Sequence, residues 1–314
     1  MKAYTLTSPE GPDGLQLSEV DTPRPGQGEV LIEVHALSLN PVDFKVARGK
    51  ALYGSLKDEQ PLIPGWDVAG RIKEVGEGVG ELVAGQNVFG MVNFPGHGQA
   101  YAEYVVAPAN QLAVIPENID FQQAAATTLA ALTAWQNLID IAGVKEGQRV
   151  LVHAAGGGVG HFAVQLAKER GAYVIGTGSG SKQDFIRELG ADEAFNYETG
   201  KFEDELGPVD VVLESLDPEH LQRSLTVVKP GGKLLTIAAG LSDQLQERAE
   251  FKSVDLYHHL VQSNGQHMQA LAERLADGRL KPHVSKTYAF ANLPDAMREL
   301  EEGSTRGKII VEVR

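Results

Sequence analysis

Residues 149–185 read RVLVHAAGGGVGHFAVQLAKERGAYVIGTGSGSKQDF, and this stretch decides the fold. Residues 149–155 are mostly apolar and predict a buried strand, while "FAVQLAKERG" predicts a helix after a run of glycines. A second apolar run, "YVIGT", predicts another strand. Strand, glycine turn, helix and strand in this order predict a β-α-β unit of a parallel sheet.

The glycine turn has the spacing of a dinucleotide-binding fingerprint, Ala155-x-Gly157-x-x-Gly160, with alanine at the first position. The glycines allow the backbone to approach a pyrophosphate, and amides at the helix start face the anion. We therefore predict that the turn binds the cofactor through Ala155, Gly156, Gly157, Gly158, Val159 and Gly160. The alternative is a glycine turn that only joins strand to helix.

The end of the second predicted strand indicates which dinucleotide binds. NAD-preferring sites carry an acidic residue about 20 residues after the glycines, where it binds the ribose 2′-hydroxyl. Here the sequence is "GTGSGSK", in which Ser179, Ser181 and Lys182 suit a 2′-phosphate, so we expect NADPH. Lys182 has the alternative of a solvated lysine in a first helical turn. Tyr197 is predicted either to pack by the adenosine ribose or to fill the strand.

Working outward, residues 1–120 contain short β-rich runs separated by Gly and Pro, whereas strands and helices alternate after the fingerprint. The prediction is an α/β protein with a mostly β first domain and a parallel sheet covered on both faces. The expected domains are 1–120, 121–258, and a segment 259–314 whose last strand, "GKIIVEV", returns to the first domain. "QQAAATTLAALTAWQNLIDIAG" predicts one long helix ending at Gly143.

Composition narrows the classes of function. The chain has 314 residues, 42% hydrophobic and 22% charged, and a formal charge of -14, which argues against nucleic-acid and anionic-membrane surfaces. Cysteine is absent, so thiolate nucleophiles and cysteine-ligated metals are excluded. No signal-peptide core or membrane-span-length apolar run occurs, so we expect a cytoplasmic protein with no membrane partner.

Several ordered motifs resemble the medium-chain dehydrogenase/reductase superfamily, and specifically its zinc-free quinone oxidoreductase branch. They are "SLNPVDFKVARG", "PLIPGWDVAGRIKEVGEGV", "NFPGHGQAYAEYVVAPANQLAVIP", "AAGGGVG" and "KPGGKLLTIA", which together cover nearly the whole chain. The resemblance implies a GroES-like β-barrel catalytic domain, a Rossmann domain that binds NADP(H), and a C-terminal segment returning to the catalytic domain. It also implies pairing of two copies as a homodimer.

The sequence departs from the zinc-dependent members of that superfamily. Their "GHE" motif is "GWD" here, with Trp66 and Asp67, and their first cysteine ligand corresponds to Asn40. An open catalytic zinc needs about three protein ligands, so we expect no metal. His153, in a predicted buried strand, is expected to be a hydrogen-bonded structural histidine. Trp66 is expected to pack at the cleft.

Without a metal, acceptors that delocalise incoming charge are favoured, and we expect hydride transfer from NADPH to a quinone or an α,β-unsaturated carbonyl. Asn40 is a candidate donor to the substrate carbonyl, and Lys45 a candidate oxyanion stabiliser or proton donor. Asp43 is expected to pair with Lys45 or contact the nicotinamide ribose, and Tyr53 to line the opening. Alternatively, Asn40 and Asp43 only satisfy backbone groups of a turn.

The resemblance adds further cofactor contacts: Thr133 in the helix before the cofactor domain, the loop Ala238, Ala239 and Gly240 after a strand end, and Val261. A helix-interior threonine bonded to its own backbone is the alternative for Thr133. The alternative function is an NADPH-binding sensing or structural protein without significant turnover.

Overall fold

The computed structural model describes residues 1–238 and 240–314 and divides into two compact units. The first unit comprises Met1–Leu132 and Gln262–Arg314, and the second comprises Thr133–Val261. The first boundary, between Leu132 and Thr133, lies 12 residues beyond residue 120, where the sequence placed it. The reason is that helix α3 (Phe121–Ala126) packs against strands β3 and β4 of the first unit. Each unit is described by itself below.

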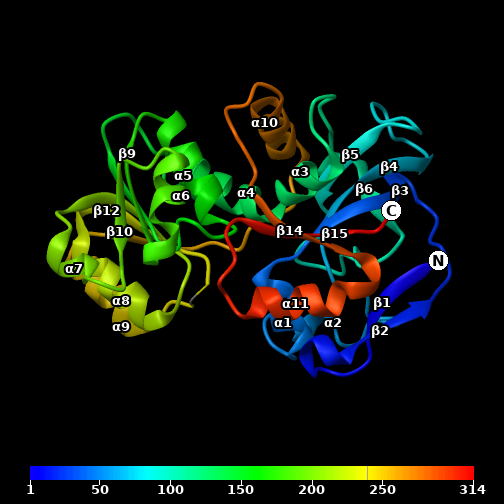
Figure 1. Ribbon diagram of the computed structural model, residues 1–314, viewed down its shortest axis with the longest axis horizontal. Helices are drawn as coiled ribbons and strands as arrows, with labels where there is room; N and C mark the ends of the chain where they lie inside the picture. Colours follow the sequence, from blue (N-terminus) through cyan, green and yellow to red (C-terminus); the bar gives the residue numbers. More distant parts are fainter. Residues whose placement is uncertain (239) are drawn as a thin grey trace. The chain divides into compact units, whose positions relative to one another are not determined.

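The second unit contains a parallel sheet which, in the described residues, has six strands in the order β10-β9-β8-β11-β12-β13 (Figure 1). This is the 3-2-1-4-5-6 order of the Rossmann fold, the fold that the family resemblance implied. Its strands are β8 (Arg149–Val152), β9 (Tyr173–Gly178), β10 (Glu193–Asn196), β11 (Val209–Glu214), β12 (Val228–Thr236) and β13 (Asp255–His258). Its helices are α5 (Gly160–Glu169), α6 (Gln183–Glu188), α7 (Phe202–Glu205), α8 (Pro218–Val227) and α9 (Asp243–Phe251), with short turns η3 (Gln136–Ile141) and η4 (Gly180–Lys182).

Helices cover the sheet on both faces because the chain runs outward from β8 in two directions. Right-handed crossovers place α5 and α6 on one face and α8 and α9 on the other, an arrangement that Figure 1 shows. Leu221 and Leu225 of α8 and Leu245 of α9 pack on Val212 and Leu234 of the sheet. This buried face fixes the strand ends from which the cofactor residues project.

The first unit is built on a mixed sheet with the strand order β14-β15-β3-β4-β5-β7, with β6 also paired to β3. Its strands are β1 (Lys2–Leu6), β2 (Leu15–Glu19), β3 (Glu29–Ser38), β4 (Asp67–Val75), β5 (Asn87–Met91), β6 (Tyr104–Pro108), β7 (Ala113–Val114), β14 (Val284–Ala289) and β15 (Lys308–Glu312). Its helices and short turns are η1 (Gly11–Gly14), α1 (Pro41–Ala47), α2 (Tyr53–Leu56), η2 (Ala109–Gln111), α3, α10 (Gly265–Ala276), η5 (Phe290–Asn292) and α11 (Leu293–Glu301). The C-terminal strand β15 pairs antiparallel with β3, so the chain's last segment does return to the first unit.

The predicted long helix after residue 120 is interrupted. It forms α3, then α4 (Leu129–Trp135), and then the π-helical turn η3. Thr127 and Thr128 bond the carbonyls of Gln123 and Ala125 through their hydroxyls, which competes with the helical backbone. The N–H of Leu129 is donated to the Asp67 carboxylate at 3.0 Å. A buried acid on a distant strand therefore accepts the first N–H of α4, and no local helix propensity could have indicated this contact.

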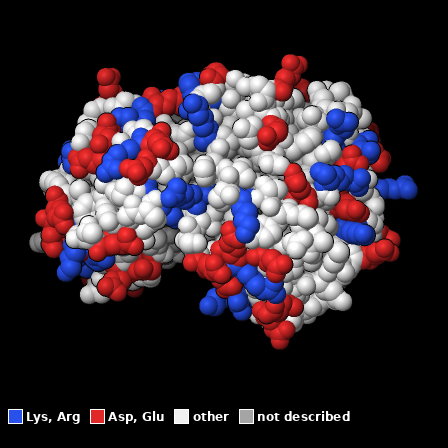
Figure 2. All heavy atoms as spheres, in the orientation of Figure 1, with Lys and Arg blue, Asp and Glu red and all other residues white. Residues whose placement is uncertain are grey.

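The surface carries mixed charge. On the face drawn in Figure 2, acidic and basic side chains are interspersed, and no broad basic patch is seen on that face. Within residues 1–238 and 240–314, no helix is both long and apolar enough to cross a membrane.

Candidate functional site

The glycine turn of the second unit runs from the end of β8 at Val152 to the start of α5 at Gly160. A Cβ on Gly160 would lie 2.2 Å from the Ala154 carbonyl oxygen, so only glycine allows this close approach of helix and strand. The N–H groups of Gly156, Gly158 and Val159 donate no hydrogen bond within the described part of the chain. The turn therefore fits a pyrophosphate at the start of α5.

The backbone of this turn contains a strained residue. Ala154, one position before the first residue of the predicted fingerprint, has φ of 48°, in the left-handed region. Alanine pays a steric penalty there that glycine avoids. The chain therefore makes its tight turn at a position where sequence reasoning saw only an ordinary alanine.

The predicted phosphate end of the site lies beside the glycine turn. A Cβ on Gly156 would be 3.2 Å from Cδ of Lys182, so the aliphatic stem of this lysine packs against the turn. The hydroxyls of Ser179 and Ser181 are 3.1 Å apart. Tyr197 follows β10, is 57% exposed, and donates its N–H to the Gly178 carbonyl. Ser179, Ser181, Lys182 and Tyr197 are thus brought to one edge of the sheet.

This edge also holds an acid that sequence reasoning missed. The Glu198 carboxylate accepts the N–H of Gly180 at 2.7 Å. Counting along the chain from the glycines finds no acid at the end of β9, but β10 is the parallel neighbour of β9, with Asn196 opposite Gly178. The residues that follow both strands meet at the same edge of the sheet. The acid could therefore have been found in "NYE", residues 196–198, at the end of the unit's third predicted strand.

The remaining predicted cofactor residues are more scattered. Thr133 is buried in α4, and its carbonyl accepts the Asn137 amide at 2.8 Å. Ala238 and Gly240 are exposed after β12, and Ala239 lies outside the described residues. Val261 is buried three residues after β13. Ala238 and Gly240 follow a strand at the carboxyl edge of the sheet, where open α/β sheets bind ligands.

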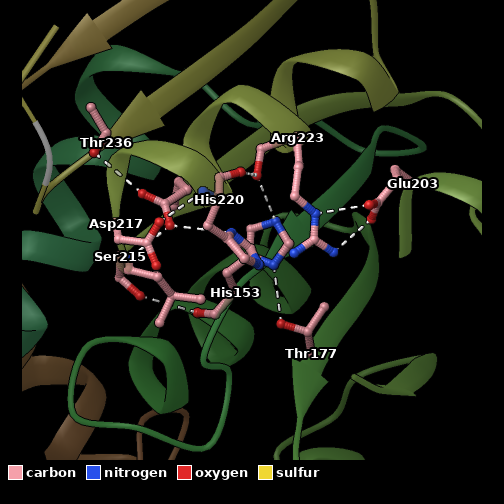
Figure 3. A network of polar contacts seen from close by, with 11 residues as sticks. His153, Thr177, Glu203, Ser215, Asp217, His220, Arg223 and Thr236 are labelled. Atoms are coloured by element: carbon pink, nitrogen blue, oxygen red, sulfur yellow. Dashed lines mark hydrogen bonds and ion pairs between the residues drawn. The ribbon is translucent and has the colours of Figure 1, made fainter. Parts of the chain in front are cut away.

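A buried polar network supports this edge (Figure 3). His153, directly after β8, bonds the Thr177 hydroxyl of β9 through Nδ1 and the Ser224 hydroxyl of α8 through Nε2, both at 3.1 Å. His220 faces the fully buried Glu214 at 3.3 Å. Burial, with His220 nearby, holds the pKa of His153 well below its usual value. His153 is the hydrogen-bonded structural histidine that the sequence predicted.

In the first unit, Asn40 and Asp43 belong to a buried cluster. Asn40 is 1% exposed, and its amide donates to Asp67 at 2.7 Å and to the Ser38 carbonyl at 3.5 Å, while its oxygen accepts the ammonium of Lys308. Asp43, 0% exposed, accepts the backbone N–H of Asn40 at 2.6 Å. Asp43 thus satisfies a backbone group of its own turn, as the alternative expects, whereas the side chain of Asn40 bonds Asp67 and Lys308 on distant strands. A direct contact with substrate stays a prediction for each.

The cluster has unusual electrostatics because it contains two carboxyls and one amine, all buried. Burial raises the pKa of Asp43 to about 7, with the Asp67 charge adding to the effect. Burial also raises the pKa of Asp67 and lowers that of Lys308. Tyr101, buried beside Asp43, has a pKa well above its usual value for the same reason. The folded protein therefore keeps the proton on Asp43 up to a higher pH than an exposed aspartate would.

Lys45 and Tyr53 are placed differently. Lys45 is half-buried on α1, and its ammonium has no hydrogen bond or ion pair with any residue that the structure describes. Asp43 does not pair with it. Tyr53 begins α2, which contacts α1, and is also half-buried. Of the four predicted catalytic residues, Lys45 and Tyr53 are the two whose side chains take no part in the buried cluster.

Trp66 is 1% exposed, packs edge-on against Phe94, and donates its indole N–H to the Gly96 carbonyl at 2.7 Å. It is therefore a packing residue. Among residues 1–238 and 240–314, no group of three His, Asp or Glu side chains is arranged to hold a metal ion.

Comparison with known proteins identifies the family. Residues 26–117 match the alcohol dehydrogenase GroES-like domain, and residues 189–311 match a family described as zinc-binding dehydrogenase. Human quinone oxidoreductase is 32% identical, with 99% of this chain and 97% of the relative covered. The chloroplastic NADPH-dependent alkenal/one oxidoreductase of Arabidopsis thaliana is also 32% identical, with 99% and 79% covered. The structure of the quinone oxidoreductase from Coxiella burnetii superposes with a TM-score of 0.95 at 34% identity, covering 100% of this chain and 99% of that one.

The fold, the glycine turn and these likenesses together define an oxidoreductase that binds a nicotinamide cofactor. The chain belongs to the medium-chain dehydrogenase/reductase superfamily, in its quinone oxidoreductase branch.

Proposed function

We propose that this protein transfers a hydride from NADPH to a quinone or an α,β-unsaturated carbonyl, without zinc. The observation that carries the choice of cofactor is the packing of Lys182 against Gly156. A cation beside a pyrophosphate-binding turn suits a 2′-phosphate, since charge-assisted bonds to phosphate are strong. The name of the Arabidopsis relative includes NADPH dependence and an alkenal/one substrate, and that of the human relative a quinone.

Bound NADPH would supply the hydride, and the residues of the chain would position the acceptor and stabilise the charge that develops on its oxygen. Lys45 is the residue proposed for this charge because its ammonium is not committed to another described group. Tyr53, at the start of the neighbouring helix, is proposed to line the acceptor site. Asn40 and Asp43 hold the start of α1, and Lys45 belongs to the same helix.

Zinc independence is supported by the chemistry of the buried cluster. Asn40 corresponds to a cysteine ligand in the zinc enzymes that the sequence resembles, and here its oxygen accepts the Lys308 ammonium. A divalent cation beside this group would face an ammonium across a poorly screened distance. The Lys308 ammonium thus supplies the positive charge beside Asn40 and disfavours a zinc ion there.

The test is oxidation of NADPH and of NADH by purified, chelator-treated protein, with a small quinone and a short-chain enone in parallel. We expect faster turnover with NADPH, unchanged by chelation. Loss of activity on chelation that zinc restores would contradict the metal-free mechanism. Tight NADPH binding with no turnover on any acceptor would favour a sensing or structural role instead. The homodimer and the cytoplasmic location stay predictions.

A further inference from the structure

The acid Glu198 lies on the loop that the proposed function assigns to the 2′-phosphate. Its carboxylate accepts the N–H of Gly180, the residue between Ser179 and Ser181, at 2.7 Å. A carboxylate and a phosphate are both anions that bind exposed backbone N–H groups. The loop therefore already carries an internal anion at the position where an external one is expected.

This contact is built by the surrounding residues. The Asn196 side chain accepts the N–H of Glu198 at 3.0 Å, which forms a tight turn after β10. Gln183 donates its amide to the carbonyls of Gly178, Ser179 and Phe195 at 3.1–3.2 Å and so ties the loop to β10. The loop and the turn that carries Glu198 therefore have a fixed relative position.

Glycine at position 180 permits the contact. A Cβ there would be 3.2 Å from the Glu198 carboxylate oxygen and 3.1 Å from Nδ2 of Asn196, tighter than most real contacts. Glu198 itself is exposed, so its side chain can leave for solvent without opening the core. The Glu198 carboxylate can thus bind the Gly180 N–H, and a ligand can displace it from this N–H into solvent.

We propose that Glu198 is a specificity-determining residue that competes with the 2′-phosphate for this loop and so lowers the preference for NADPH over NADH. The inference rests on the proposed NADPH site. A 2′-phosphate cannot share the Gly180 N–H with a carboxylate, because two anions at one donor repel each other. NADPH must displace Glu198, whereas NADH, with a 2′-hydroxyl, leaves it in place.

The test measures binding of NADPH and of NADH by isothermal titration calorimetry, on the full chain and without any acceptor. Glu198→Gln removes the charge and keeps the shape, and Glu198→Ala removes the contact. Both should tighten NADPH binding by about two- to fivefold, the upper part of the range for one exposed charge contact, and leave NADH binding unchanged. The control is Glu188→Gln on α6, an exposed acid whose carboxylate bonds no described residue and whose substitution makes the same charge change.

A Lys182→Ala variant separates this inference from the proposed function. If Lys182→Ala weakens NADPH but not NADH binding, and Glu198→Gln tightens only NADPH, both stand. If Lys182→Ala behaves in this way but Glu198→Gln leaves NADPH binding unchanged, weakens it, or tightens both dinucleotides equally, the inference about Glu198 is overturned and the NADPH site survives. If wild type does not bind NADPH more tightly than NADH and Lys182→Ala changes neither, the NADPH site fails, and the competition with it.

Discussion

Replacing Asp43 by asparagine should make the free energy of unfolding of the first unit depend less on pH. Asp43 is fully buried, with Asp67, Lys308 and Tyr101 as its titratable neighbours. An asparagine can still accept the Asn40 N–H, so the variant resembles the protonated acid. The wild-type carboxyl must ionise inside the protein as the pH rises, whereas the variant side chain never does.

The sign follows from the raised pKa. Asp43 has a pKa of about 7 when folded and about 3.9 when unfolded, which corresponds to about 4 kcal/mol over the whole titration. In this window the folded protein binds more protons, so the stabilisation is full below about pH 4 and is lost as the pH rises through about 7. Between about pH 5 and pH 8.5, wild type should lose about 2–3 kcal/mol relative to Asp43→Asn.

The assay is urea unfolding across this pH range in a Trp135→Phe background, in which Trp66 is the remaining tryptophan and reports on the first unit. Asp58→Asn, an exposed acid in the same unit, is the control and should give a flat difference from wild type. A flat difference for Asp43→Asn would refute the reasoning. A gain in wild-type stability with rising pH would mean that Lys308 keeps Asp43 ionised in the folded protein.

Three further variants test separate parts of the structure. Lys308→Met should destabilise the first unit by about 3–5 kcal/mol in urea unfolding, because it removes the ammonium that bonds Leu39 and Asn40 and whose charge offsets Asp67 and Asp43; a loss below about 1 kcal/mol would show that the cluster adapts. Ala154→Gly should stabilise the second unit by about 0.5–1 kcal/mol by relieving the left-handed φ, and the control Ala155→Gly should not. Lys45→Met should lower kcat with NADPH and quinone about tenfold or more without changing NADPH binding, while Lys50→Met on the exposed turn changes neither; an unchanged kcat would remove Lys45 from the mechanism.

The second unit was largely predictable because its signals are local. The predicted strand "YVIGT", residues 173–177, differs from β9 by one residue at its end. Buried parallel strands have continuous apolar runs, and glycine marks each turn, so periodicity and turn chemistry agree. The order of the strands depends on which strands pair, and pairing joins stretches that are far apart in the sequence.

The candidate site was less predictable because its key contacts join residues far apart in the chain. Glu198 reaches Gly180 only because β9 and β10 are neighbours, and Lys308 reaches Asn40 only because β15 pairs with β3. Residue type alone does not show that Asn40 bonds Asp67 and Lys308 or that Asp43 accepts the Asn40 N–H, and a catalytic role for either stays a prediction. Burial distinguishes these cases, and burial is a property of the fold.

The geometry of α1 connects the buried cluster to the proposed chemistry. Successive residues of an α-helix are rotated by about 100°, so residues two apart point in nearly opposite directions. The Asn40 N–H and the cluster fix Asp43 on the buried face of α1, and Lys45 must then project away from that face. An acid and a lysine in "DFK" therefore do not pair, although their spacing in the sequence suggests it. The acid anchors the helix and leaves the lysine available, so disturbing Asp43 should alter kcat only through the position of Lys45.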